Sequence, residues 1–138
     1  MWDLVNTQKP YPKAVPVLFE HLESGYPEPI REGIARALAV PEANTFWGRI
    51  LAHYKGEKSG RLKDGLAVAL AGAATPKERT TLLEVVRNRR HGPSRLLLLP
   101  ALIRLSPATA EEVLEEFKDD PDLRKEVRVL QRVVKRKT

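Results

Sequence analysis

The 138-residue sequence contains no cysteine. This absence excludes disulfide bonds, thiol nucleophiles and thiolate metal sites, and it fits a reducing compartment. The start, Met1 to Val5, carries neither the basic segment nor the long apolar stretch of a secretory signal. The longest apolar run, Leu96 to Ile103, has eight residues including Pro100, which is too short to cross a membrane. We therefore expect a cytoplasmic protein without a membrane partner.

The sequence also lacks the short motifs of common catalytic sites. It has no HExxH, no GxSxG and no glycine-rich phosphate loop. Neither Asp3 nor Asp64 stands in a recognisable catalytic motif. We therefore expect no enzymatic activity, no catalytic residue and no cofactor.

Charge is distributed unevenly along the chain. The net charge is +6, and residues 87–138 account for most of it, with 13 basic and 8 acidic side chains. A basic region attracts nucleic acid, anionic lipid or an acidic protein, and composition does not choose among them. An acidic cluster in the same region would repel a DNA backbone laid beside it, which favours a protein partner; its members are Glu111, Glu112, Glu115, Glu116, Asp119 and Asp120.

A 32-residue repeat organises the chain. Residues 30–38 (IREGIARAL) and 62–70 (LKDGLAVAL) match at most positions, and residues 94–102 keep the same frame. A fixed period of about 20–50 residues is the signature of stacked repeats. We expect a lead-in at 1–11 and repeats at about 12–43, 44–75, 76–107 and 108–138. Four columns carry the pattern: Leu18, Ile50, Leu82 and Leu114; Ile34, Leu66, Leu98 and Leu130; Leu38, Leu70, Leu102 and Val134; and Ala37, Ala69 and Ala101.

Each half of a repeat has the apolar period of a helix, and no stretch alternates as a strand would. Thr75 to Glu78 combines an N-cap, a proline at the first helical position and a capping-box glutamate. Pro100 should bend its helix or lie at a break. A helix pair cannot bury its own apolar stripe, so the pairs must stack. The expected helices are 12–24, 29–40, 45–55, 61–73, 76–90, 94–105, 108–119 and 121–136.

The sequence Ile30-Arg31-x-x-Ile34-x-x-Ala37-Leu38, with its copies from Leu62 and Ser94, resembles the second-helix signature of HEAT-like repeats. The class is the one named from phycobilin lyase subunits, and the resemblance covers about residues 12–136. It implies an all-α, right-handed α-solenoid of four helix pairs whose second helices line the inner face. Proteins of this class include protein-binding scaffolds, chromophore-lyase subunits and DNA glycosylases for alkylated bases.

One position departs from the HEAT-like pattern. These units usually place an acidic residue shortly before the signature basic residue, where it forms a polar ladder between repeats. This chain has Glu28 there in the first unit, but the aligned residues in the later units are Gly60, Gly92 and Arg124. The usual acidic partner is therefore present only once.

Arg31, Lys63 and Arg95 form a basic column with one residue per repeat, each in the first turn of a second helix. A cation there opposes the helix macrodipole, at about 0.3–1 kcal/mol if nothing compensates it. One interpretation is structural, with Glu32 and Asp64 pairing with the column across repeats. The other is an anion-binding stripe for phosphate or carboxylate. The pattern leaves both open and favours the structural one.

Three further features have a structural and a functional interpretation. Trp47 can stack on a base or anchor a partner, but large aromatic residues are more often core residues. His21 and His53 are in register, yet two imidazoles without a third ligand make a metal site improbable, so we expect none. Gly33 and Gly65 share one mid-helix position, where either a neighbouring helix packs closely or a ligand approaches the backbone, and the pattern favours close packing.

Together these observations predict a non-catalytic protein-protein interaction module, such as an adaptor, an assembly factor or an inhibitor. Its partner would be another protein with an acidic surface. The alternative is a nucleic-acid-binding protein related to the alkylated-base DNA glycosylases, and a third possibility is a fragment of a longer repeat array. The predicted contact surface is the inner face, with Arg31, Arg36, Lys63, Arg95 and Trp47.

Overall fold

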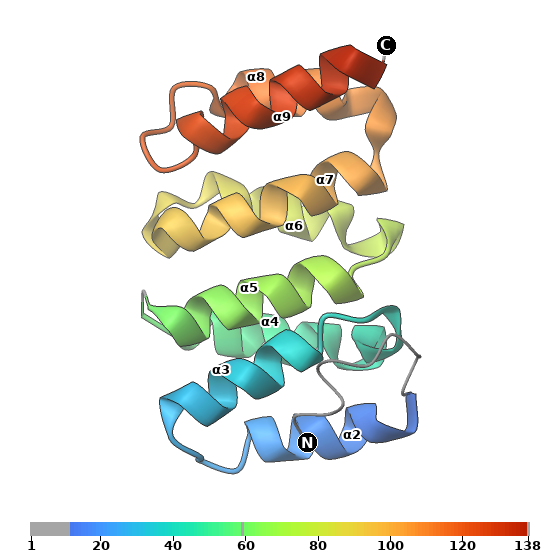
Figure 1. The fold of residues 1–138 in the computed structure, drawn as a ribbon, viewed down its shortest axis with the longest axis vertical. Helices are drawn as coiled ribbons and strands as arrows, with labels where there is room; N and C mark the ends of the chain where they lie inside the picture. The colour runs from blue at the N-terminus through green and yellow to red at the C-terminus, as the bar shows by residue number, and fades with distance from the viewer. Residues whose placement is uncertain (1–11, 59, 138) are drawn as a thin grey trace. The chain divides into compact units, whose positions relative to one another are not determined.

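The computed structural model describes residues 12–58 and 60–137. Within them the protein is all-α, with eight α-helices, five 3₁₀ helices and no strand (Figure 1). The predicted fold class is thereby confirmed at the level of all-α. The predicted lead-in, residues 1–11, lies outside the described residues. None of the helices in the described part of the chain has the length and apolarity needed to cross a bilayer.

The chain divides into two compact units between Ala74 and Thr75, next to the expected boundary of the second and third repeats. The helices of the first unit are η1 (Pro12–Ala14), α2 (Val15–Leu22), α3 (Glu28–Ala37), η2 (Pro41–Phe46), α4 (Trp47–Gly56) and α5 (Arg61–Ala73). Those of the second unit are η3 (Pro76–Glu78), α6 (Arg79–Arg87), η4 (Arg89–Leu98), α7 (Leu99–Leu105), η5 (Pro107–Thr109), α8 (Ala110–Phe117) and α9 (Arg124–Lys137).

Each of the eight expected helices overlaps one α-helix, and the expected 61–73 coincides with α5. Most of the others differ at their N-terminal ends, where a 3₁₀ turn precedes the α-helix. The largest difference is at 94–105, where the α-helix begins only at Leu99. Gly92 has a φ of 67°, in the left-handed region, and this interrupts the helical backbone before α7 begins. Pro100 lies in the first turn of α7, where its missing N–H costs nothing, so the predicted break is confirmed.

In the first unit, α3 packs against both α2 and α5, and α4 packs against α5 (Figure 1). Two glycines of α5 permit its close approach to α3 and to the residues that follow α3. A Cβ added at Gly72 would lie 2.5 Å from the backbone oxygen of Ala39, and one added at Gly65 would lie 3.1 Å from that of Glu32. The close helix packing predicted at Gly65 is therefore confirmed.

In the second unit, α6 packs against η4 and α7, while α8 packs against α7 and α9. The capping box predicted before α6 is present. The Glu78 carboxylate accepts hydrogen bonds from the backbone N–H of Thr75 at 2.7 Å and from its hydroxyl at 2.8 Å. The first of these bonds satisfies the N-cap N–H, a donor that the start of a helix otherwise leaves unpaired.

Candidate binding cleft and the buried basic column

The three residues of the basic column make the same backbone contact. Each donates a hydrogen bond to the carbonyl of the residue nine positions earlier, in the last turn of the preceding α-helix. A cation at a helix C-terminus satisfies unpaired carbonyls and interacts favourably with the macrodipole. For Arg31 and Lys63, which lie in the first turns of α3 and α5, this placement offsets the cost expected there. Arg95 does not lie in the first turn of an α-helix as predicted, because it belongs to η4 and α7 begins only at Leu99. The pairs are Arg31 Nε with Leu22 at 3.2 Å, Lys63 Nζ with Tyr54 at 3.2 Å, and Arg95 Nη1 with Val86 at 2.7 Å.

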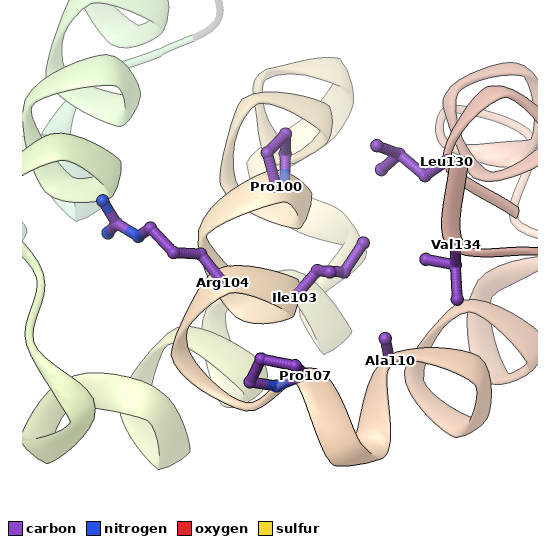
Figure 2. A pocket seen from close by; sticks show the side chains of 7 residues that line it. All are labelled: Pro100, Ile103, Arg104, Pro107, Ala110, Leu130 and Val134. Atoms are coloured by element: carbon purple, nitrogen blue, oxygen red, sulfur yellow. The ribbon is translucent and has the colours of Figure 1, made fainter. Parts of the chain in front are cut away.

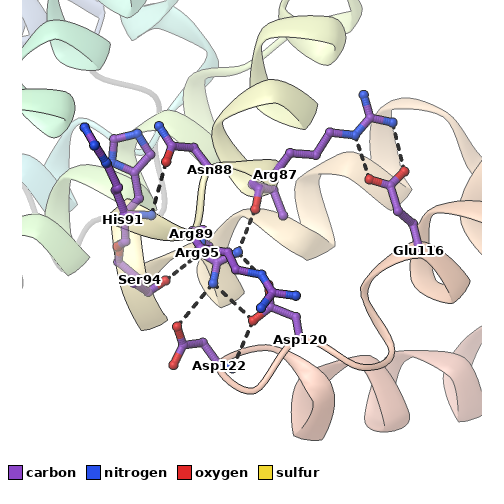
Figure 3. Close-up of polar contacts among 12 residues, drawn as sticks. Arg87, Asn88, Arg89, His91, Ser94, Arg95, Glu116, Asp120 and Asp122 are labelled. Atoms are coloured by element: carbon purple, nitrogen blue, oxygen red, sulfur yellow. Dashed lines mark hydrogen bonds and ion pairs between the residues drawn. The ribbon is translucent and has the colours of Figure 1, made fainter.

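Arg95 is completely buried, with 0% of its surface exposed. All five of its N–H groups have acceptors (Figure 3). Nε donates to the Gly92 carbonyl at 2.8 Å, and Nη1 shares its two bonds between Val86 and Asp120. Nη2 donates to Asp120 at 3.1 Å and to Asp122 at 3.2 Å. Arg95 therefore fastens the α6–η4 segment to the loop between α8 and α9.

Asp120 is buried opposite Arg95. Burial by itself raises the pKa of the Asp120 carboxyl, but the hydrogen bonds from Arg95 and from the backbone N–H of Asp122 more than offset that effect, together with the charges of Arg95 and Arg89. The net pKa of Asp120 is lowered. A buried carboxylate thus stays charged because its partners are fixed around it.

Lys63 is also buried, with 3% of its surface exposed. Besides the Tyr54 carbonyl, its ammonium contacts the carbonyl of Glu57 at 2.9 Å and lies 4.5 Å from the centre of the Tyr54 ring. Burial lowers the pKa of Lys63, and the charge of Glu57 offsets this only in part. The ammonium is therefore enclosed by the end of α4.

These positions correct the predicted contact surface. Lys63, Arg95 and Trp47 are buried, so an incoming partner cannot reach them. Trp47, with 6% exposed, donates from its indole nitrogen to the Leu70 carbonyl at 3.0 Å, which matches the core interpretation. Arg31 is half-buried against the end of α2. Arg36 alone of the five is exposed, and it pairs within α3 with Glu32 at 2.9 Å.

The two histidines belong to separate polar contacts. His53 Nε2 lies 2.9 Å from the Glu23 carboxylate, which also pairs with Arg49. His21 Nδ1 lies 3.0 Å from the Tyr26 hydroxyl. Among the described residues, no three histidine or carboxylate side chains gather in a way that could hold a metal ion.

A cleft of about 550 Å³ lies in the second unit between α7 and α9. Six of its seven lining side chains are apolar, and Arg104 is the exception. Figure 2 shows Ile103 on α7 pointing toward Leu130 and Val134 on α9, whereas the Arg104 guanidinium points away from them. The seven are Pro100, Ile103, Arg104, Pro107, Ala110, Leu130 and Val134.

The cleft exists because α9 leaves part of its apolar face uncovered. In the two leucine-rich columns of the second halves, the first three members are buried, but the fourth members, Leu130 and Val134, are only half-buried. The alanine column is buried at Ala37, Ala69 and Ala101, and the residue 32 positions later is Val133, which is 40% exposed. The repeat pattern predicts that these positions are apolar, but it does not predict that in the fourth repeat they are partly exposed to solvent.

The outer surfaces of α8 and α9 have opposite charge. The exposed acidic residues of α8 and the turn after it are Glu111, Glu112, Glu115, Glu116 and Asp119. The exposed basic residues of α9 are Arg124, Lys125, Arg128, Arg132, Lys135 and Arg136. The single acidic residue of α9 is Glu126, which is half-buried. The basic excess of the C-terminal region therefore gathers on α9, beside the cleft.

No protein-family model, curated protein or solved structure matches this chain. Within the described residues, the α7–α9 cleft with the adjoining face of α9 combines an apolar hollow with exposed apolar and basic side chains. A sequence signal for this site existed, since Val133 replaces alanine in its column and basic residues surround it.

Proposed function

We propose that the chain is a non-catalytic protein-protein interaction module built from HEAT-like helix pairs. Its contact site is the α7–α9 cleft, and its partner is a protein with an acidic surface. The repeat is supported by the hydrogen bond from Arg31, Lys63 and Arg95 to a carbonyl nine residues earlier, which recurs every 32 residues. An equivalent contact at the same spacing in three successive copies is expected when each copy is the same supersecondary unit.

The observation that carries the proposal is the uncovered apolar surface of the second unit. Val129 and Val133 are 50% and 40% exposed, and they stand beside Leu130 and Val134 of the cleft. Contiguous exposed apolar surface with a polar rim is a mark of interaction sites. Its rim of cations on α9 favours a partner of opposite charge, because complementary charge steers association and excludes wrong partners.

The cleft offers little to a polar substrate. Arg104 is its single charged lining residue, and the remaining side chains provide no group for acid-base or nucleophilic chemistry. The cations of α9 are the observation that favours nucleic acid instead. Against it, residues 75–138 contain one Phe, Tyr or Trp, and that residue, Phe117, is buried. This unit therefore has no exposed Phe, Tyr or Trp ring for stacking a base.

The experiment is capture from a lysate of the source cells, followed by reconstitution with the purified candidate partner. Ile103→Asp places a charge in the cleft, and Val17→Asp places the same charge on the exposed face of α2 as a matched control. We expect the purified partner to bind wild type and the control equally, and Ile103→Asp about tenfold more weakly or worse.

Retained helicity and unfolding temperature would show that each variant is folded. A partner that binds Ile103→Asp as well as wild type would contradict the proposed site. Duplex DNA bound with micromolar or tighter affinity, with a steep loss on raising the salt concentration, would favour the nucleic-acid alternative.

A further inference from the structure

We propose that the partner segment recognised by this protein is an amphipathic helix with acidic flanks, which lies along the exposed face of α9. This inference rests on the proposed function and specifies the partner for the same site. The face consists of Val129 and Val133, the cleft residues Leu130 and Val134 at its edge, and the row of cations beside it.

The shape of the partner follows from how the same columns are covered elsewhere in the chain. On α3, the equivalents of Leu130, Val133 and Val134 are Ile34, Ala37 and Leu38, and all three are buried. The neighbours of α3 are helices, α2 and α5. The apolar face that α9 exposes has the helical spacing of those columns, so a helix is the element that matches it.

Val129 and Val133 lie one helical turn apart, and Leu130 and Val133 are three residues apart, so all three share one side of α9. A partner helix with apolar residues at i, i+3 or i+4, and i+7 can contact this side along its length. The larger valine in place of the buried alanines gives such a helix more apolar surface to cover. The cleft then receives a side chain of the partner beside Ile103.

The charge of the partner follows from the residues that border the valines. Lys125 precedes Val129 by one turn, and Arg128 and Arg132 form the adjacent row. Their long side chains can lie over apolar surface while their charged ends reach the flank of a bound helix. A partner helix with Glu or Asp on that flank gains charge-assisted contacts, whereas one with Lys is repelled.

The probe is a fluorescein-labelled synthetic peptide of about 18 residues, long enough for five helical turns. It carries leucines at the i, i+3 or i+4, i+7 spacing and glutamates on the remaining face. One control peptide has the same composition with the leucines scrambled, and another has lysine in place of glutamate. Fluorescence anisotropy at about 0.05 M and about 0.3 M salt measures binding to the 138-residue chain.

We expect the acidic amphipathic peptide to bind and both control peptides to bind about tenfold more weakly or not at all. Val133→Glu should weaken binding about tenfold or more, as should the pair Arg128→Glu and Arg132→Glu. Val17→Glu and Arg61→Glu, at exposed positions of the first unit, are the matched controls and should leave binding unchanged.

Equal binding of all three peptides, absence of binding by the acidic peptide, or wild-type affinity in Val133→Glu would overturn the inference. So would self-association that Val133→Glu abolishes, because a second copy would then be the occupant of this face. The proposed function is judged separately. If a purified partner requires Ile103 while the acidic peptide fails to bind, the cleft remains the contact site and only the acidic helix is wrong.

Discussion

Arg95 and Asp120 form a buried pair in which two guanidinium nitrogens donate to two carboxylate oxygens at 2.8 and 3.1 Å. The pair joins the part of η4 that follows Gly92 to the loop before α9, across 25 residues of sequence. Arg95 also contacts the carbonyls of Val86 and Gly92. Removing either partner therefore leaves charge or backbone oxygens buried without partners.

Replacing Arg95 with methionine should strongly destabilise the protein. The side chain keeps some apolar volume but leaves Asp120 unpaired, and breaking a buried pair in this way costs about 3–5 kcal/mol. Urea unfolding followed by circular dichroism measures the change. In a double-mutant cycle with Asp120→Leu, we expect the double variant to lose less stability than the sum of the single variants. Additive losses would mean that the two residues do not depend on each other.

The other two members of the basic column should follow the order of their burial. Lys63→Met removes the buried contacts to Tyr54 and Glu57, so it should cost about 1–3 kcal/mol. Arg31→Met removes a half-buried bond to Leu22 and should cost about 1 kcal/mol. The free energies of unfolding of the two variants check this order. A reversed order would show that burial does not set the strength of these capping contacts.

Gly72→Ala should destabilise the first unit because its Cβ would lie 2.5 Å from the Ala39 oxygen, which is a backbone atom and cannot easily move. We expect a loss of about 1–3 kcal/mol, the usual cost of overpacking. Gly48→Ala in α4 is the matched control, because nothing lies within 4 Å of its added Cβ. It should gain up to about 1 kcal/mol from helix propensity. Similar changes in the unfolding midpoint for both variants would contradict the close packing of Gly72 on the backbone of Ala39, just after α3.

Acid should weaken the Arg95–Asp120 pair. The pKa of Asp120 is lowered in the folded protein, so the pair contributes its full stability above the ordinary carboxyl value of 3.8. That contribution is lost as the pH falls from there through the lower folded-state pKa. The stability difference between wild type and Asp120→Asn should accordingly shrink as the pH is lowered from about 6 to about 2.5. A difference that stays constant over this range would rule out a depressed pKa at this carboxyl.

The helices could be predicted because their signals are local. The apolar period, the Thr75–Glu78 capping box and Pro100 each act within a few residues, and the structure places helices, a cap and a break there. The 3₁₀ turns before several α-helices were missed, since they differ from α-helix by small changes in backbone angle that no residue pattern specifies. Because of these 3₁₀ turns, several α-helices begin later than expected, but the fold class is unchanged.

The candidate site was less accessible to prediction. The sequence alone determined the 32-residue recurrence, the all-α class, the apolar columns and the concentration of positive charge near the C-terminus, because each depends on residue type and spacing. Tertiary structure decided which members of those patterns face solvent. It buried Lys63 and Arg95 at the ends of earlier helices, nine residues away, and it left Val133 exposed and Leu130 half-buried. The physical reason is that a residue's type determines how much free energy its contacts can contribute. Its exposure depends instead on which segments, distant in sequence, pack over it.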